Sequence, residues 1–239
     1  EGVAELAAEQ ERLARALAGG LDAGAFWRTG QGKSRVYWLL VSRGRRVVYI
    51  APTVSLVVDQ VASCGARCGG DALVAAALGR AATDPSHPAT AVVCGALPFT
   101  AMPAPTAARQ LRSIFWLHER LLAADLPGLT LVVDEVHAAW AWQTFVPAYA
   151  AVWRQLGAAA VRPPLLVLSA TFAPYQVARL PLRGAAAISR GPRRRANLAL
   201  HVCEGLGTLE GLVAALAIVA RGIELRDAVA AAAAELAAP

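Results

Sequence analysis

Lysine is almost missing from this sequence of 239 residues: Lys33 is the only one, and the other 22 basic residues are arginine. Charged residues are also scarce, at 17% of the chain, while hydrophobic residues make up 56%, a balance that excludes a disordered tail. The net charge of +6 permits an anionic partner such as nucleic acid, although a basic surface is more often simply solvated. Since arginine serves as the cation everywhere else, the single lysine needs a chemical explanation.

Cysteines are few and are not arranged as a metal site. Cys64 and Cys68 form a lone C-x3-C pair without a second pair or nearby histidines, which argues against structural zinc. Together with Cys94 and Cys203 they are expected to be reduced thiols of a cytosolic protein.

Long hydrophobic runs and a targeting segment are also missing. The longest apolar run near the carboxyl end covers residues 212–220 and is too short to span a bilayer. The chain begins with an acidic, amphipathic stretch that is unlike a signal peptide, so we expect a cytoplasmic protein without membrane contact. The first residue is not methionine, as in a piece of a longer protein.

Helical and strand patterns alternate along the chain. Helices are predicted over residues 3–19, 34–42, 55–65 and 109–126. Strands are predicted over residues 45–52, 90–96, 129–137, 164–171, 186–190 and 197–202, and a proline-broken loop over residues 96–108. Most of these strands are apolar throughout, which predicts an α/β fold with a mainly parallel sheet and helices on both faces. Such sheets bind ligands at the carboxyl ends of their strands, where polar residues of this chain cluster.

The lone lysine lies in the glycine-rich segment TGQGKS, residues 29–34. Gly30 and Gly32 allow the backbone to turn its N–H groups toward an anion, and the following helix adds its positive end. Lys33 would then reach the β- and γ-phosphates of a nucleotide, and Ser34 would offer its hydroxyl to Mg²⁺. The broad guanidinium of arginine fits that position poorly, which explains why a lysine is kept. The alternative is a glycine-rich turn without a ligand, because the first glycine of the longer pattern would fall at Trp27.

The second chemical element is the segment LVVDEVH, in which an apolar strand runs into Asp134 and Glu135. Asp134 could hold Mg²⁺, usually through water, and Glu135 could orient or deprotonate an attacking water molecule. The alternative is a strand end with two solvated acids. The order of the two elements, phosphate loop before acidic pair, favours a single phosphate-and-metal site.

Several segments together resemble the RecQ branch of superfamily 2 helicases. Motifs I, Ia, II and III of these helicases are similar to TGQGKS, APTVSLVVDQV (51–61), DEVHAAWAWQTFVPAY (134–149) and LSAT (168–171). The RecQ pattern P-x-x-S-L-x-x-D-Q-V is matched by Pro52, Ser55, Leu56, Asp59, Gln60 and Val61, and its aromatic-rich loop by Trp142, Phe145, Pro147 and Tyr149. The segment RRRANLALHV (193–202) resembles the end of the first RecA-like domain.

The resemblance implies an ATP hydrolase with a RecA-like P-loop fold, using ATP and Mg²⁺ and moving on single-stranded or junction DNA, 3′ to 5′. It assigns nucleotide binding to Gln10, Thr29, Gly30, Gln31, Gly32, Lys33 and Ser34, with Gln10 recognising the adenine. It assigns catalysis to Lys33, Asp134, Glu135 and His137, and the metal to Ser34 and Asp134. DNA binding or coupling to DNA falls to Pro52, Ser55, Gln60, Trp142, Phe145, Ser169 and Thr171. Stacking on Trp142 and Phe145 would sense the strand, unless these rings serve only core packing.

The resemblance also predicts the domain organisation. Residues 1–203 would form the first RecA-like domain, and residues 204–239 a linker with the incomplete start of a second. The second domain, which supplies an arginine finger worth about 10³–10⁵ in rate, is missing from this chain, so the chain alone should bind ATP better than it hydrolyses it. The alternative function is a degenerate helicase-like scaffold that binds nucleotide or DNA in a DNA-modification or defence complex. A loop one residue shorter than the family's, with Val146 replacing an arginine, favours that alternative, as does the missing second domain. The intact Lys33, Asp134 and Glu135 oppose it. An unrelated P-loop kinase is disfavoured by the RecQ-type matches.

Overall fold

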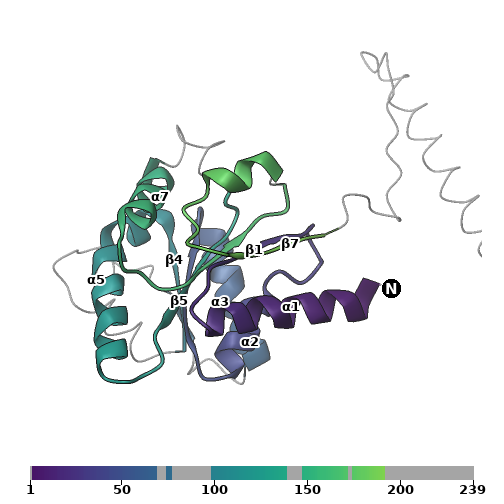
Figure 1. The fold of residues 1–239 in the computed structure, drawn as a ribbon, viewed down its shortest axis with the longest axis horizontal. Coiled ribbons are helices and arrows are strands. Elements are labelled where there is room, and N and C mark those ends of the chain that lie inside the picture. The colour runs from purple at the N-terminus through teal and green to yellow at the C-terminus, as the bar shows by residue number, and fades with distance from the viewer. Residues whose placement is uncertain (1, 69–73, 77–97, 139–146, 172–173, 192–239) are drawn as a thin grey trace, which may run out of the picture. The chain divides into compact units, whose positions relative to one another are not determined.

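The computed structural model describes residues 2–68, 74–76, 98–138, 147–171 and 174–191 (Figure 1). All of them belong to one compact unit, residues 1–192. The elements in chain order are α1 (Gly2–Ala18), β1 (Ala23–Phe26), α2 (Arg35–Ser42), β2 (Arg46–Ala51), α3 (Val54–Cys68), β3 (Val74–Ala76), β4 (Phe99–Pro103), α5 (Ala104–Ala123), β5 (Leu129–Val133), α7 (Pro147–Ala158), β6 (Leu165–Leu168), the 3-10 helix η3 (Pro174–Arg179) and β7 (Ala187–Arg190).

The strands form one seven-stranded sheet in the order β3-β4-β2-β5-β6-β1-β7. Every pair is parallel: Val48 of β2, for example, lies beside Leu131 of β5 on one side and Thr100 of β4 on the other. Parallel strands need crossover connections, which the helices supply. The predicted α/β fold with a parallel sheet is therefore confirmed.

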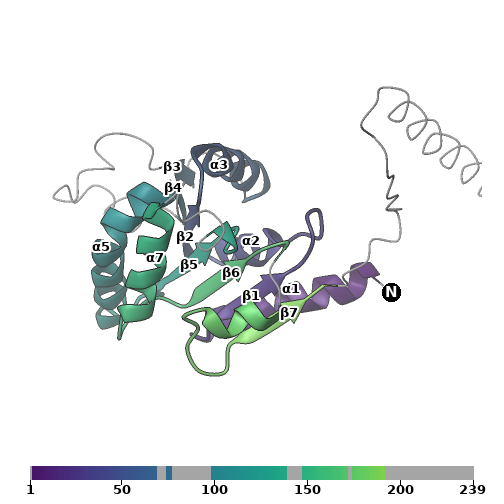
Figure 2. The same ribbon diagram turned by 90° about the horizontal axis from the view of Figure 1, so that it is seen from above.

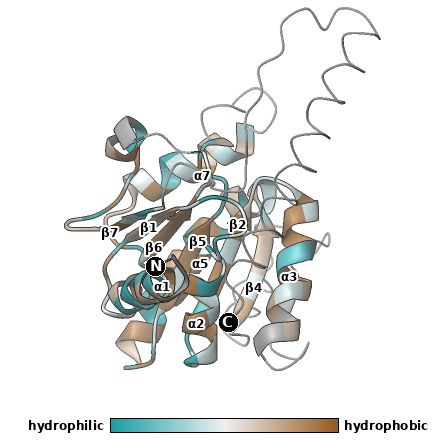
Figure 3. Cartoon of the chain, turned by 90° about the vertical axis from the view of Figure 1, so that its right-hand side faces the viewer, coloured by the Kyte–Doolittle hydropathy of each residue, from teal (hydrophilic) through white to brown (hydrophobic). Residues whose placement is uncertain are grey.

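Helices cover both faces of the sheet (Figure 2). Alternate residues of the central strands pack against the helices on opposite faces. Val48 and Ile50 of β2 point into a core with α5 and α7, whereas Val47 and Tyr49 point into a core with α1, α2 and α3. This alternation follows from the two-residue period of a strand. Because both faces are covered, the central strands are mostly apolar, and most of them are brown in Figure 3, while the surrounding helices carry both hydrophilic and hydrophobic colours.

The prediction of a proline-broken loop over residues 96–108 is wrong. The structure places strand β4 there, and α5 begins directly after it. The prolines are accommodated because Pro103 ends the strand and Pro105 lies in the first helical turn, where a missing N–H group costs nothing. The short strands β1 and β3 were not predicted from the sequence. Alanine and glycine dominate β1 and have low strand propensity, so its pairing with β6 and β7 depends on tertiary contacts.

Several sequence predictions fall outside the described residues: the strands over 90–96 and 197–202, the boundary at residue 203, and the segment 204–239. Among the described cysteine side chains, Cys64 is buried and forms no disulfide. No helix in the described part of the chain is long and apolar enough to cross a membrane.

Candidate nucleotide-binding and active site

The glycine-rich segment forms the loop between β1 and α2. Gly30 and Gly32 have φ angles of +84° and +73°, in the left-handed region that favours glycine. The side-chain oxygen of Gln31 accepts a hydrogen bond from the N–H of Arg28 at 2.8 Å, which fixes the bend of the loop. Ser34 is the cap residue of α2, and its hydroxyl makes no capping hydrogen bond. The loop borders a cavity of about 770 Å³.

Lys33 lies in this cavity and donates a hydrogen bond from Nζ to the carbonyl oxygen of Trp27 at 3.0 Å. The Trp27 ring is turned into the core, with the residue only 1% exposed, and its Nε1–H donates to Ser189 Oγ at 2.9 Å. The backbone at residue 27 thus continues from the end of β1, and the side chain does not enter the cavity. This arrangement explains how the phosphate loop tolerates tryptophan where the longer sequence pattern has a glycine.

Gln10 connects α1 to the same loop. Its Nε2 donates to the carbonyl oxygens of Gln31 at 3.4 Å and Gly32 at 3.2 Å. The residue is 4% exposed, and its Oε1 has no hydrogen-bond partner within the described part of the chain. An unpaired buried carbonyl oxygen is costly, so this atom is suited to accept a hydrogen bond from a ligand that enters the cavity.

The close approach of Gln10 makes Gly32 sensitive to substitution. A Cβ at this position would lie 2.7 Å from Gln10 Nε2, in addition to the strain of φ +73°. We predict that Gly32→Ala lowers the free energy of unfolding by about 1 kcal/mol and weakens binding of a fluorescent ATP analogue. Gly44→Ala is the matched control, because Gly44 has the same φ and open space around it. Equal ATP affinities for the two variants would contradict the role assigned to Gly32.

Asp134 follows β5 and is held in place from several sides. Its Oδ2 accepts a hydrogen bond from Tyr49 Oη at 2.6 Å, and its Oδ1 accepts from the N–H of Glu135 at 2.8 Å. Burial raises the pKa of Asp134, while these hydrogen bonds and the nearby charges of Lys33 and His137 act in the opposite direction. A buried carboxylate at the end of a strand, facing the cavity, is suited to receive a cation.

Glu135 has φ +48°, an uncommon conformation for a non-glycine residue. Its Oε2 lies 3.1 Å from Nδ1 of His137, and the same His137 nitrogen lies 3.2 Å from Ser169 Oγ. Ser169 follows β6, and its Oγ also accepts from the N–H of Thr171 at 3.3 Å. Burial, followed by repulsion from Asp134, raises the pKa of Glu135. Glu135 is therefore suited to accept a proton, and His137 connects it to β6.

The structure brings most of the predicted nucleotide and catalytic residues together. The cavity is lined by Gln10, Thr29, Gly30, Gln31, Gly32, Lys33, Ser34, Asp134 and Glu135, and also by Leu6, Ala7, Arg35, Trp38, Leu56 and Gln60.

The residues predicted to bind DNA or to couple to it are more scattered. Gln60 lines the cavity and accepts a hydrogen bond from Tyr37 Oη. Pro52 is buried at the end of β2, and Ser55 is exposed on α3. Trp142 and Phe145 lie outside the described residues.

Two tyrosines support the site through contacts that were not predicted from the sequence. Tyr49 donates a hydrogen bond to the Asp134 carboxylate. Tyr149, which the resemblance assigned to the aromatic-rich loop, lies in α7 and donates to the Asp134 carbonyl oxygen. A signal for Tyr49 existed, because a tyrosine inside an otherwise apolar strand needs a buried partner for its hydroxyl group.

The parallel sheet with a phosphate loop after β1 and an acidic pair after β5 defines a RecA-like P-loop domain of the helicase type. The model of the family described as DEAD/DEAH box helicase matches residues 7–180, and the chain belongs to this family. Its structure is similar to the crystal structure of the Pyrococcus furiosus Hef helicase domain, with a TM-score of 0.52 and 17% sequence identity. That match covers 76% of this chain and 37% of the Hef helicase chain. No curated protein matches the sequence.

Proposed function

We propose that this chain is the first RecA-like half of a RecQ-like DNA helicase, which binds Mg-ATP in the cavity and moves on single-stranded DNA, 3′ to 5′. The observation that carries the proposal is the convergence of Gln10 from α1, Lys33 from the loop after β1, and the Asp134–Glu135 pair from β5 on one cavity. Each group comes from a different element, and together they supply an adenine contact, a phosphate contact and a metal-and-water site.

The residues of the cavity fit Mg-ATP. Bound Mg-ATP supplies the phosphoanhydride whose cleavage drives a helicase motor. Lys33 and the N–H groups of the glycine loop would hold the phosphates, while the unpaired Oε1 of Gln10 would accept a hydrogen bond from the base. Ser34 and Asp134 would hold the metal, and Glu135 would take the proton of the attacking water.

Coupling to DNA would run through the contact of His137 with Ser169. His137 lies within 3.2 Å of both Glu135 and Ser169, so it links the acidic pair to the segment after β6 that contains Thr171. Single-stranded DNA or a junction would be contacted by Pro52, Ser55, Trp142 and Phe145. A second RecA-like domain would supply the arginine that completes the active site.

The proposal is tested by ATP binding and turnover of the full chain. Binding of a fluorescent ATP analogue and phosphate release from Mg-ATP are measured with oligo(dT), with single-stranded RNA and without nucleic acid. We expect ATP binding that is lost in Lys33→Ala, and slow turnover that single-stranded DNA accelerates more than RNA does. Stimulation by RNA alone would contradict the RecQ-like assignment. ATP binding without any turnover would indicate a half-motor that needs its second RecA-like domain. No ATP binding at all would favour the helicase-like scaffold.

A further inference from the structure

Helix α5 carries a basic and aromatic face toward solvent. Arg109, Arg112, Trp116 and Arg120 follow one another at spacings of three, four and four residues, and all four are exposed. This spacing places them within about 80° of one another around the helix axis. We call these four residues the Arg–Trp face.

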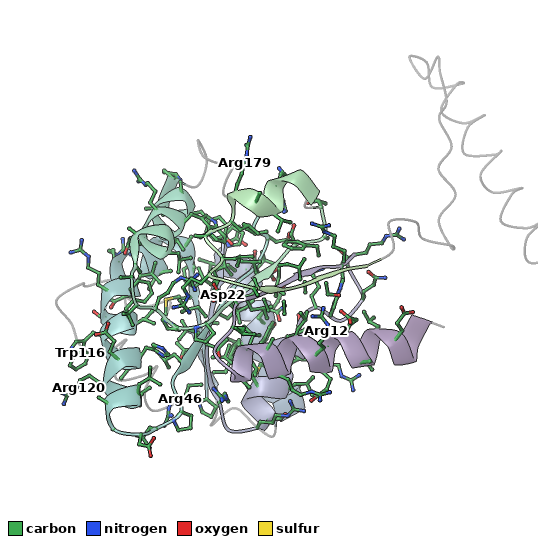
Figure 4. All side chains as sticks on the ribbon, in the orientation of Figure 1. Arg12, Asp22, Arg46, Trp116, Arg120 and Arg179 are labelled. Atoms are coloured by element: carbon green, nitrogen blue, oxygen red, sulfur yellow. The ribbon has the colours of Figure 1, made fainter. Side chains whose placement is uncertain are left out.

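Trp116 is the most exposed of the large hydrophobic residues in the described part of the chain, with 58% of its surface accessible. Burial of α5 does not require it, because Leu111, Ile114 and Leu121 already anchor the helix in the core. The guanidinium carbon of Arg120 lies 5.9 Å from the centre of the Trp116 ring, a cation–π contact that holds the ring near a positive charge. Figure 4 shows both side chains extending outward from α5.

The Arg–Trp face is separate from the nucleotide cavity. α5 packs with α7 on one face of the sheet, whereas the helical residues that line the cavity come from α1, α2 and α3 on the other face. Those motif residues proposed to contact or couple to DNA that the structure describes follow β2 and β6 and lie outside α5 and α7. The proposed motor mechanism therefore leaves this surface without a role.

We propose that the Arg–Trp face binds a single strand of nucleic acid outside the motor site. Its three arginines can pair with phosphates, and the free side of the Trp116 ring can stack on a base. From Arg109 to Arg120 the helix rises about 16 Å, the length of roughly five nucleotide steps at 3.4 Å each. Glu119 is the one acidic residue of α5, and its exposed negative charge partly offsets the charges of the three arginines. The choice of nucleic acid rests on the proposed function, but binding at this face requires no ATP.

The test is binding of fluorescein-labelled dT20 to the full chain without nucleotide. Fluorescence anisotropy measures the affinity at several salt concentrations. We expect Trp116→Ala to weaken binding roughly tenfold and to leave the salt dependence unchanged, because stacking releases no counterions. Arg112→Ala should weaken binding and reduce the slope of log K against log salt by about 0.7, the value for one phosphate contact of a single strand. Arg15→Ala is the control, because Arg15 is exposed on α1. This substitution also removes one positive charge, but from the face of the sheet opposite α5.

Circular dichroism and thermal melting of each variant exclude loss of folding as the cause, and Trp116→Phe should retain most of the affinity. The inference is overturned if Trp116→Ala and Arg112→Ala bind dT20 with the affinity and salt slope of Arg15→Ala. In that case the Arg–Trp face would either bind an acidic protein surface or simply be solvated. ATP binding that is lost in Lys33→Ala would show that the motor assignment stands even if this inference fails. No ATP binding, beside dT20 binding that Trp116→Ala weakens, would show that this inference stands even if the motor assignment fails.

Discussion

Replacing Glu135 by glutamine is expected to reduce ATP turnover about 10²–10⁴-fold while ATP binding persists. Glutamine has nearly the shape of glutamate but cannot accept the proton of an attacking water molecule. The reduction should appear in single-turnover assays with labelled ATP, which remain sensitive when the arginine of a second domain is not supplied. Titration with a fluorescent ATP analogue should give an affinity close to that of the unaltered chain.

The geometry around Glu135 makes this substitution informative. The backbone is fixed in the φ +48° conformation, its N–H donates to Asp134 Oδ1, and the carboxylate lies beside His137. These contacts keep residue 135 in place in the variant, so lost turnover reports lost chemistry. Asp134→Asn is the comparison, because it should also weaken the dependence of ATP binding on Mg²⁺. Unchanged turnover in Glu135→Gln would show that Glu135 is not the general base.

The parallel sheet and the position of the cavity could be predicted from sequence for a general reason. Apolar strands that each end in polar residues place those residues at one edge of a parallel sheet, whichever strands are neighbours. Lys33 and the Asp134–Glu135 pair were therefore expected at the same edge of the sheet, although about one hundred residues separate them in the sequence. The observed strand order β5-β6-β1 brings them to one cavity. The strand β4 was not predicted, because Pro98 precedes it and Pro103 ends it, a pattern typical of a loop, while its pairing with β2 depends on a distant segment.

The supporting contacts of the site were beyond sequence analysis because they are set by packing. Nothing near Trp27 in the sequence indicates that its carbonyl oxygen accepts from Lys33 while its ring binds Ser189 across the sheet edge. Gln60 belongs to a motif associated with DNA, but α3 turns it into the nucleotide cavity, where it meets Tyr37. Spacing identifies which residues share a motif, and only the packing of helices against the sheet decides which surface each residue meets.

Asp22 lies just before β1 and is labelled in Figure 4. Its side chain is buried together with that of Arg162. Two guanidinium nitrogens of Arg162 donate to its carboxylate at 3.1 and 2.7 Å. The N–H groups of Leu165 and Arg183 add bonds of 2.9 and 2.7 Å. One carboxylate thus holds the start of β1, the start of β6 and the segment that leads to β7.

Replacing Asp22 by asparagine is expected to lower the free energy of unfolding by about 3–5 kcal/mol, because Arg162 becomes a buried charge without a counterion. For a unit of this size that corresponds to a fall in Tm of roughly 10 °C, measurable by circular dichroism. Arg162→Met should destabilise less, since Asp22 keeps the two N–H donors and lies 3.5 Å from the Arg183 guanidinium. Glu11→Gln is the surface control: it disrupts an exposed ion pair with Arg43 and should leave Tm unchanged.

The dependence of stability on pH separates the charge of Asp22 from its shape. Burial raises the pKa of Asp22, but the hydrogen bonds from Arg162 and the two N–H groups outweigh it, so the pKa lies below its usual value. A lowered pKa in the folded state means that the stabilisation is complete above the unfolded value of about 3.9 and is lost as the pH falls through the folded value. The difference in unfolding free energy between the unaltered chain and Asp22→Asn should therefore be constant near neutral pH and shrink below about pH 4. A difference that does not change with pH would assign the effect to hydrogen-bond geometry, and the charge of Asp22 would then contribute nothing to the fold.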